Sequence, residues 1–279
     1  ESVMNKKKVK PGSVLIFLFC CIVAFTMIVP FAWMVSASFK LNTEIFEYPI
    51  RWIPKVFHMD NYDKVWNSIA FPTYFMNTLK LAVIITVLQL FTCSLAAYAF
   101  TKLKFPGRDL IFLAYLATMM VPWHAIMIPQ FLVVRTLGLY NTHASLILMQ
   151  AFSAFGVFIL RQNMLSIPDS LHEAAKIDGC STFGIYAKII LPLTRSGLAI
   201  LTVLTFNNVW NDYMGPMIYL DSDNLKTIQI GLAAFKQQYS TDYGSIMAGT
   251  VCSLIPVLII YILGQKQIMD GVAFTGVKG

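Results

Sequence analysis

The sequence predicts an all-α, polytopic membrane protein with six transmembrane helices. Hydrophobic residues make up 57% of the chain and charged residues only 13%, which is too apolar for an ordinary soluble domain. A membrane-spanning helix needs about 20 mostly apolar residues. Six windows with short connections meet that requirement, at residues 13–37, 77–100, 110–134, 143–160, 197–220 and 244–264.

The first window predicts a retained membrane anchor, because it is too long for a signal peptide and lies far from any small-residue cleavage site. Orientation follows from Lys and Arg, which are enriched in cytoplasmic loops. A cytoplasmic N-terminus places most of the 21 Lys and Arg residues inside, and it places both termini there. The net charge of +7 then reflects cationic side chains that face anionic lipid. The lack of a dense basic patch argues against nucleic-acid binding.

The first external segment, residues 39–76, mixes turn residues with Trp and Tyr, which prefer the headgroup boundary. Its pattern predicts a short amphipathic helix over residues 60–69 that lies on the membrane. The segment is consistent with an interfacial anchor and with contact to an external partner, and the sequence leaves both open.

The third window ends in a stretch that contains Pro122 and Pro129. Each proline removes a backbone donor, so we expect the helix to be kinked or interrupted there. Such breaks either line cavities or serve packing alone. His124 has no carboxylate beside it in sequence, and we interpret it as a packing or interfacial residue.

A polar segment, residues 162–196, separates the fourth and fifth windows. Ser170 and Glu173 have the spacing of a capping box, which predicts that a helix starts at Ser170. Gly179 supplies the stop. Helical spacing places four residues on one side as a face of mostly small residues: Leu171, Ala174, Ala175 and Asp178.

A second short helix is predicted directly after Gly179. Ser181 or Thr182 provides its cap, and Pro192 ends it before the fifth window. Helical spacing places Phe183, Tyr186, Ala187 and Ile190 on one stripe. The predicted product is a helix-turn-helix knob below the membrane, which has the shape of a docking element.

The fifth window contains an unusually polar stretch, with Asn207, Asn208, Trp210, Asn211 and Asp212. Amides and aromatic rings suit hydroxylated ligands such as sugars. Polar residues in spans also hold helices together. The sequence therefore predicts either a lining of a translocation pathway or hydrogen bonding between helices.

Other chemistries are excluded by missing residues. The segment from His172 to Lys176 lacks the second His of a zinc-protease motif, and no phosphate-binding Gly-x-x-x-x-Gly-Lys-Ser/Thr loop occurs. The competing class is an ion-driven secondary transporter or channel, which usually carries paired ionisable residues in its spans. Only Lys80 and Asp212 come close to that pattern.

The polar segment resembles the EAA motif of binding-protein-dependent ABC importer permeases. The matching residues are Glu173-Ala-Ala, Asp178-Gly179 and Leu191-Pro192. The resemblance extends to Asn61-Tyr62, Pro168, Trp210-Asn211 and the ending from Val277 to Gly279. The chain is most similar to the carbohydrate-uptake branch and, within it, to the smaller six-span subunit of the maltose-importer second-permease type.

This resemblance implies a type I ABC importer permease fold with a cytoplasmic coupling helix between spans four and five. It implies half of a transporter, whose partners are a homologous second permease subunit, a dimer of ABC ATPase subunits, an extracytoplasmic solute-binding protein and a carbohydrate. The chain itself is then no enzyme and binds no cofactor, with ATP and Mg on the ATPase subunits. The residues implied in ATPase docking are Glu173, Ala174, Ala175, Asp178, Gly179, Phe183 and Pro192. For Glu173, capping and docking both remain open.

We therefore expect a multi-pass protein of the bacterial cell membrane with three parts. Residues 1–12 form a cytoplasmic N-terminal segment, residues 13–264 form the six-span domain with its coupling loop at 162–196, and residues 265–279 form a cytoplasmic tail. The tail departs from the family pattern at Met269-Asp-Gly271, so a frayed end and an ATPase contact both remain open. Disaccharides, oligosaccharides, uronic-acid oligomers, polyols and glycerophosphate-like solutes all remain candidates.

Overall fold

The structure, a computed structural model, describes residues 11–68, 70–236 and 241–276. These residues are almost entirely helical, with one isolated bridge between Lys236 and Thr241 and no strand among them. The chain divides into two units, one of residues 1–68 and 235–252, and one of residues 69–234 and 253–279. The predicted all-α class is confirmed.

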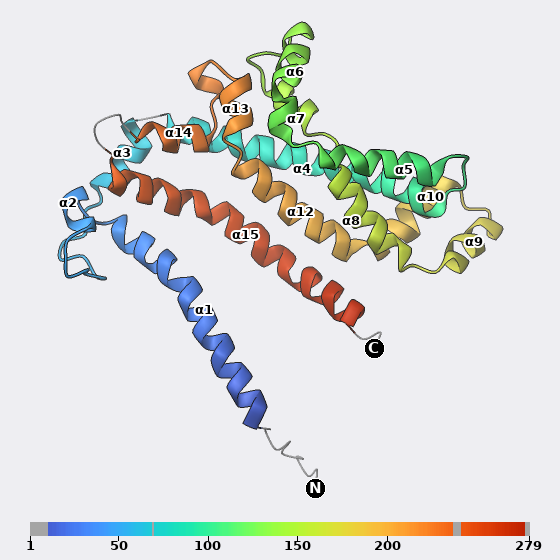
Figure 1. The fold of residues 1–279 in the computed structure, drawn as a ribbon, viewed down its shortest axis with the longest axis horizontal. Coiled ribbons are helices and arrows are strands. Elements are labelled where there is room, and N and C mark those ends of the chain that lie inside the picture. The colour runs from blue at the N-terminus through green and yellow to red at the C-terminus, as the bar shows by residue number, and fades with distance from the viewer. Residues whose placement is uncertain (1–10, 69, 237–240, 277–279) are drawn as a thin grey trace. The chain divides into compact units, whose positions relative to one another are not determined.

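The first unit contains α1 (Pro11–Ala37), α2 (Asn42–Ile45), α3 (Asp60–Ser68) and the start of α15 (Tyr243–Gly276). Helix α1 is long and apolar enough to span a membrane (Figure 1). Helix α3 matches the short helix predicted over residues 60–69, as far as residue 68; residue 69 lies outside the described residues.

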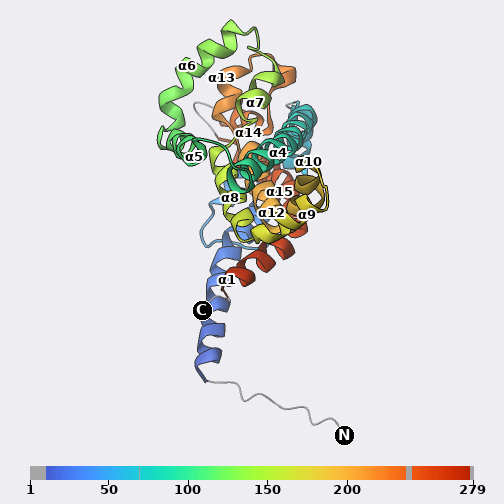
Figure 2. The ribbon, with the colours of Figure 1, turned by 90° about the vertical axis from the view of Figure 1, so that its right-hand side faces the viewer.

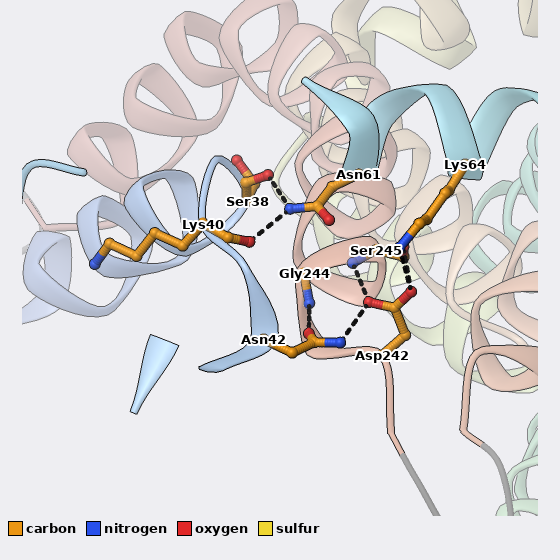
Figure 3. Close-up of polar contacts among 8 residues, drawn as sticks. All are labelled: Ser38, Lys40, Asn42, Asn61, Lys64, Asp242, Gly244 and Ser245. Carbon is orange, nitrogen blue, oxygen red and sulfur yellow. Dashed lines mark hydrogen bonds and ion pairs between the residues drawn. The ribbon is translucent and has the colours of Figure 1, made fainter. Parts of the chain in front are cut away.

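Amide and carboxylate side chains connect the helices of the first unit (Figure 3). Asn61 on α3 is buried and donates to the carbonyls that follow α1, at 2.9 Å to Ser38 and 2.8 Å to Lys40. Asp242, just before α15, accepts from Asn42 at 3.1 Å and from the Ser245 hydroxyl at 2.8 Å. The Asn61 bonds satisfy carbonyls where α1 ends, and at the start of α15 the N–H groups of Ser245 and Gly244 donate to Asp242 at 3.2 Å and to Asn42 at 2.8 Å.

Acidification is expected to weaken the first unit through Asp242. Burial raises the pKa of Asp242, but bonds from Ser245 and Asn42 and the Lys64 charge outweigh it, so the pKa lies below its ordinary 3.8. The carboxylate therefore stabilises the fold above that pH, and its contribution is lost as the pH falls through the folded-state pKa. At pH 7, Asp242→Asn should cost about 1–3 kcal/mol.

The check is thermal unfolding of the purified protein in detergent. The melting temperature of Asp242→Asn should be lower than that of the wild type at pH 7, and the gap should narrow below pH ~4. Asp221→Asn, at an exposed position of the second unit, is the control and should melt like the wild type. An equal gap at both pH values would contradict the role of the charge.

The second unit is built around α4 (Phe71–Lys102), against which α8 (Ala154–Leu165) and α12 (Arg195–Trp210) pack. Its apolar core includes Ala97, Leu160, Ile190 and Leu201. The remaining elements are α5 (Arg108–Ala117), η1 (Thr118–Met120), α6 (Trp123–Thr136), α7 (His143–Met149), α9 (Asp169–Ile177), α10 (Thr182–Ile185), η2 (Tyr186–Ile190), α11 (Leu191–Leu193), α13 (Met214–Tyr219), η3 (Asp223–Leu225), α14 (Ile228–Ala234) and the rest of α15.

In the described residues, three helices are long and apolar enough to cross a membrane, and three bent helix pairs bring the number of spans to as many as six. The bent pairs are 108–120 with 123–136 (100°), 143–149 with 154–165 (43°) and 182–193 with 195–210 (77°). The break predicted at Pro122 is confirmed, and Figure 2 shows α6 turning away from α5.

The break in the fourth span was not predicted, since no Pro or Gly lies there. Carbonyls exposed between α7 and α8 accept bonds from α4 side chains: Gln89 to Gln150 (2.7 Å) and Thr92 to Ala151 (2.8 Å). An unpaired carbonyl at membrane depth is costly, so these two bonds permit the break.

Among the predicted boundaries that differ from the structure are those of the fifth and sixth windows. The fifth window was read as one helix over 197–220, but α12 ends at Trp210 and α13 begins at Met214. The Asp212 carboxylate accepts from the Gly215 N–H at 3.0 Å, which stabilises the start of a new helix. Helix α15 continues without a break through residue 264 to Gly276, so the tail begins as helix.

Candidate functional site

The polar segment 162–196 forms the predicted pair of short helices. Helix α9 runs from Asp169 to Ile177, and Gly179 follows in the left-handed region with φ 78°. Its neighbour Cys180 donates from its N–H to the Ala175 carbonyl at 3.0 Å. A side chain at Gly179 would strain this turn, so the predicted stop at Gly179 is confirmed.

The predicted capping box at Ser170 is wrong. Helix α9 starts one residue earlier, with Pro168 at the N-cap and no side-chain cap bond, so Ser170 lies inside the helix. The start is held instead by Lys102 at the end of α4, whose Nζ donates to the Asp169 carboxylate and to the Ile167 carbonyl, each at 2.6 Å. That ion pair and hydrogen bond also hold the pKa of Asp169 below its usual range.

Two tyrosines tie the segment to α4. The Tyr98 hydroxyl lies 3.1 Å from His172 Nε2 and donates to the Thr182 carbonyl at 3.2 Å. The Tyr186 hydroxyl pairs with Ser94 at 2.8 Å in the buried interior. The sequence reasoning missed these α4 residues, because their spacing along α4 is that of an ordinary apolar span. The knob is therefore fixed to the longest helix of the second unit.

The second short helix starts as predicted, since Ser181 accepts from the Gly184 N–H at 3.1 Å. It ends at Leu193, one residue beyond the predicted Pro192. The chain continues through the π-helix η2 and through α11 to Leu193, and it bends at Thr194. Proline cannot donate to the preceding turn, and a π-turn accommodates that missing bond. Thr194 then closes the helix with N–H and hydroxyl bonds to the Ile190 carbonyl, at 3.0 and 2.6 Å.

Most of the residues predicted for docking are exposed: Glu173, Ala174, Asp178, Gly179, Phe183 and Pro192, with only Ala175 buried. The Glu173 side chain, within α9, has no hydrogen bond or ion pair to the described part of the chain. Phe183 is 63% exposed, so it lies off the buried stripe that Tyr186 and Ile190 form. Ile177, which the sequence reasoning missed, is 86% exposed although it is aliphatic. An exposed apolar side chain beside an unpaired acid suits contact with another protein.

A second feature is an open cavity of about 650 Å³ in the second unit, lined by α6, α7, α13 and the end of α12. The elements α6, α7 and α13 lie well apart from α9 and α10 along the second unit (Figure 1). The polar lining residues are His124, Gln130, Gln150, Asn208, Asn211 and Asp212. The aromatic ones are Trp123, Tyr213 and Tyr219.

Three of the five predicted pathway residues line this cavity: Asn208, Asn211 and Asp212. Asn207 does not line it, but its carbonyl and side-chain oxygens accept from Asn211 at 2.9 and 3.0 Å. Trp210 is 1% exposed and belongs to the core, so it does not line this cavity. His124, which the sequence suggested as a packing or interfacial residue, also lines the cavity. Gln130 and Gln150 were missed because they lie in other windows.

The family of binding-protein-dependent transport system inner membrane components matches residues 89–268, which is more than half of the chain. The chain belongs to this family. It is a multi-pass membrane permease, and the resemblance stated for the EAA motif is confirmed.

The permease is similar to several bacterial permeases over nearly its whole length. It is 34% identical to the arabinooligosaccharides transport system permease protein AraQ of Halalkalibacterium halodurans (92% of this chain, 93% of the relative). It is also 34% identical to the lactose transport system permease protein LacG of Rhizobium radiobacter (89% and 90%). The probable ABC transporter permease protein YurM of Bacillus subtilis is likewise 34% identical (96% and 88%).

A solved structure supports the fold. The permease matches a chain from a bacterial ABC transporter involved in the import of the acidic polysaccharide alginate, with a TM-score of 0.81 and 25% identity. The match covers 94% of this chain and 99% of the other. The six-span permease fold is thus confirmed, and the alternative of an ion-driven transporter or channel is not favoured.

Proposed function

We propose that this permease is one of two homologous membrane subunits of an ATP-driven importer of oligosaccharides. The observation that carries the proposal is similarity to arabinooligosaccharide and lactose permeases over about nine-tenths of the chain. The identity of the single sugar depends on the whole translocation pathway, so one subunit indicates only the class of solute. A solute-binding protein outside the membrane delivers the sugar.

In this proposal, the segment 162–196 couples the permease to an ATPase dimer. Its support is physical: the knob is tied to α4 by Lys102, Tyr98 and Ser94, and it presents Glu173 and Ile177 without partners in the described chain. A rigidly held knob passes a displacement of the ATPase to the spans as a rigid-body movement. ATP and Mg bind to the ATPase subunits, and this chain supplies no catalytic group and binds no cofactor.

Charge supports the orientation we propose. The end of the second unit that carries α9 and α10 also carries the cations of the 101–109 and 162–196 segments: Lys102, Lys104, Arg108, Lys176, Lys188 and Arg195. Lys and Arg mark the cytoplasmic side. The knob then lies in the cytoplasm of a bacterial cell, both termini lie on the same side as the knob, and the cavity end lies toward the outside.

Affinity purification of the tagged chain from native membranes in mild detergent, followed by mass spectrometry, tests the assembly. We expect an ABC ATPase and a second permease of the same family to be recovered with it. A homo-oligomer without an ATPase would overturn the proposal.

A further inference from the structure

We propose that the cavity of this subunit selects neutral oligosaccharides against acidic ones, with Asp212 as the specificity-determining residue. The inference rests on the proposed function and names the chemical class of its solute. The cavity belongs wholly to the second unit, so every contact used below lies within one unit.

The charge of the lining is one-sided. Asp212 contributes a carboxylate, and none of the lining residues in the described chain is Lys or Arg. Acidic sugars need cationic partners for their carboxylates, most often the bidentate fork of Arg. A solute carboxylate in this cavity therefore meets the like charge of Asp212 and no Lys or Arg of this chain.

Asp212 is fixed in place within the cavity. Its Oδ2 accepts from Gln150 Nε2 at 3.0 Å, and its Oδ1 accepts from the Gly215 N–H at 3.0 Å. Gly215 permits this approach, because a Cβ there would lie 2.6 Å from Asp212 Oδ2. A carboxylate has about four acceptor positions, so both oxygens keep capacity for the hydroxyl groups of a sugar.

The remaining lining matches a neutral sugar. Asn208 and Asn211 present amides, and Tyr213 and Trp123 present rings that suit the apolar faces of pyranose units. Trp123 donates from Nε1 to Gln130 at 3.0 Å, which fixes its ring. Rigid rings and amides around one acceptor are the chemistry of hydroxyl recognition.

The fold does not settle the charge of the solute by itself, since the structural relative belongs to an importer of an acidic polysaccharide. The selection between neutral and acidic solutes therefore depends on the side chains that line the cavity. His124 is the one lining residue that is able to add a positive charge, and its ring packs against Trp123 with centroids 5.5 Å apart.

The test measures binding of two matched trisaccharides to the purified full complex without its binding protein, by equilibrium dialysis at pH 8. The probes are a neutral galactose trisaccharide and trigalacturonate, which differ at C6. We expect the neutral sugar to bind more tightly by on the order of ten- to a hundredfold, as two like charges near each other in a protein require. Asp212→Asn should remove most of this preference, because it removes the negative charge. The amide oxygen of Asn keeps an acceptor for the Gly215 N–H, so the local fold is retained.

Two variants serve as controls. Asp223→Asn removes an exposed carboxylate outside the cavity, and it should leave the ratio of affinities unchanged. His124→Gln should leave the preference for the neutral sugar in place. Equal binding of both probes, tighter binding of trigalacturonate, an unchanged ratio in Asp212→Asn or no binding of either probe would each overturn the inference. None of these outcomes affects recovery of the ATPase, on which the proposed function depends.

Discussion

Replacing Ile177 with aspartate is expected to abolish the association of the ATPase with this permease. Ile177 is 86% exposed at the end of α9, directly before the predicted docking residue Asp178, and it contacts little of its own chain. A charge in the centre of an apolar contact is poorly tolerated, and loss of a central anchor weakens binding by on the order of 30-fold or more. Glu173→Lys should preserve membrane insertion but uncouple ATP hydrolysis from uptake, or release the ATPase from the complex.

The measurement is the amount of ATPase recovered per permease in detergent. Ile177→Leu is the matched control, because it keeps an apolar side chain of equal volume, and it should retain the ATPase. Since Ile177 is exposed, the yield and melting temperature of the permease itself should not change in either variant. Normal ATPase recovery and normal uptake in Ile177→Asp would refute docking at this face.

Trp210→Ala should destabilise the second unit by about 3–5 kcal/mol, the usual cost of removing a large buried ring. The indole is 1% exposed and stacks on Phe206 with centroids 5.5 Å apart. Its Nε1 donates to Ser253 on α15 at 3.0 Å, and Phe75 on α4 meets its face edge-on. The residue therefore joins α12 to α4 and α15.

Thermal unfolding and membrane yield measure this effect. Trp210→Phe keeps a ring and loses the hydrogen bond, so it should cost far less than Trp210→Ala. If Trp210→Ala melted normally but transported poorly, the residue would line the pathway after all.

The sequence predicted the architecture because the apolar windows that identify spans are long and occur six times. Apolar windows longer than the membrane is thick identify spans by composition alone, and Pro122 marked the break in the third. Gly179 and Ser181 were readable because a positive φ and a helix cap each demand particular residue types.

What the sequence could not predict depends on contacts between distant residues. The break after α7 follows from Gln89 and Thr92, which bind its carbonyls from another helix. The start of α9 is set by Lys102, which overrides the local pattern of Ser170 and Glu173. Which residues of the polar stretch in the fifth window face the cavity depends on where α12 ends, and the sequence does not show that Trp210 packs in the core.

Uptake of a labelled neutral oligosaccharide into proteoliposomes tests the central claim most directly. The vesicles would contain the complex purified through this chain, with its solute-binding protein on the delivery side and ATP on the side of α9. Accumulation that requires ATP, and that disappears in Ile177→Asp while Ile177→Leu is active, is the predicted result. Uptake that proceeds without ATP, or that is driven by an ion gradient, would contradict the assignment as an ATP-driven importer subunit.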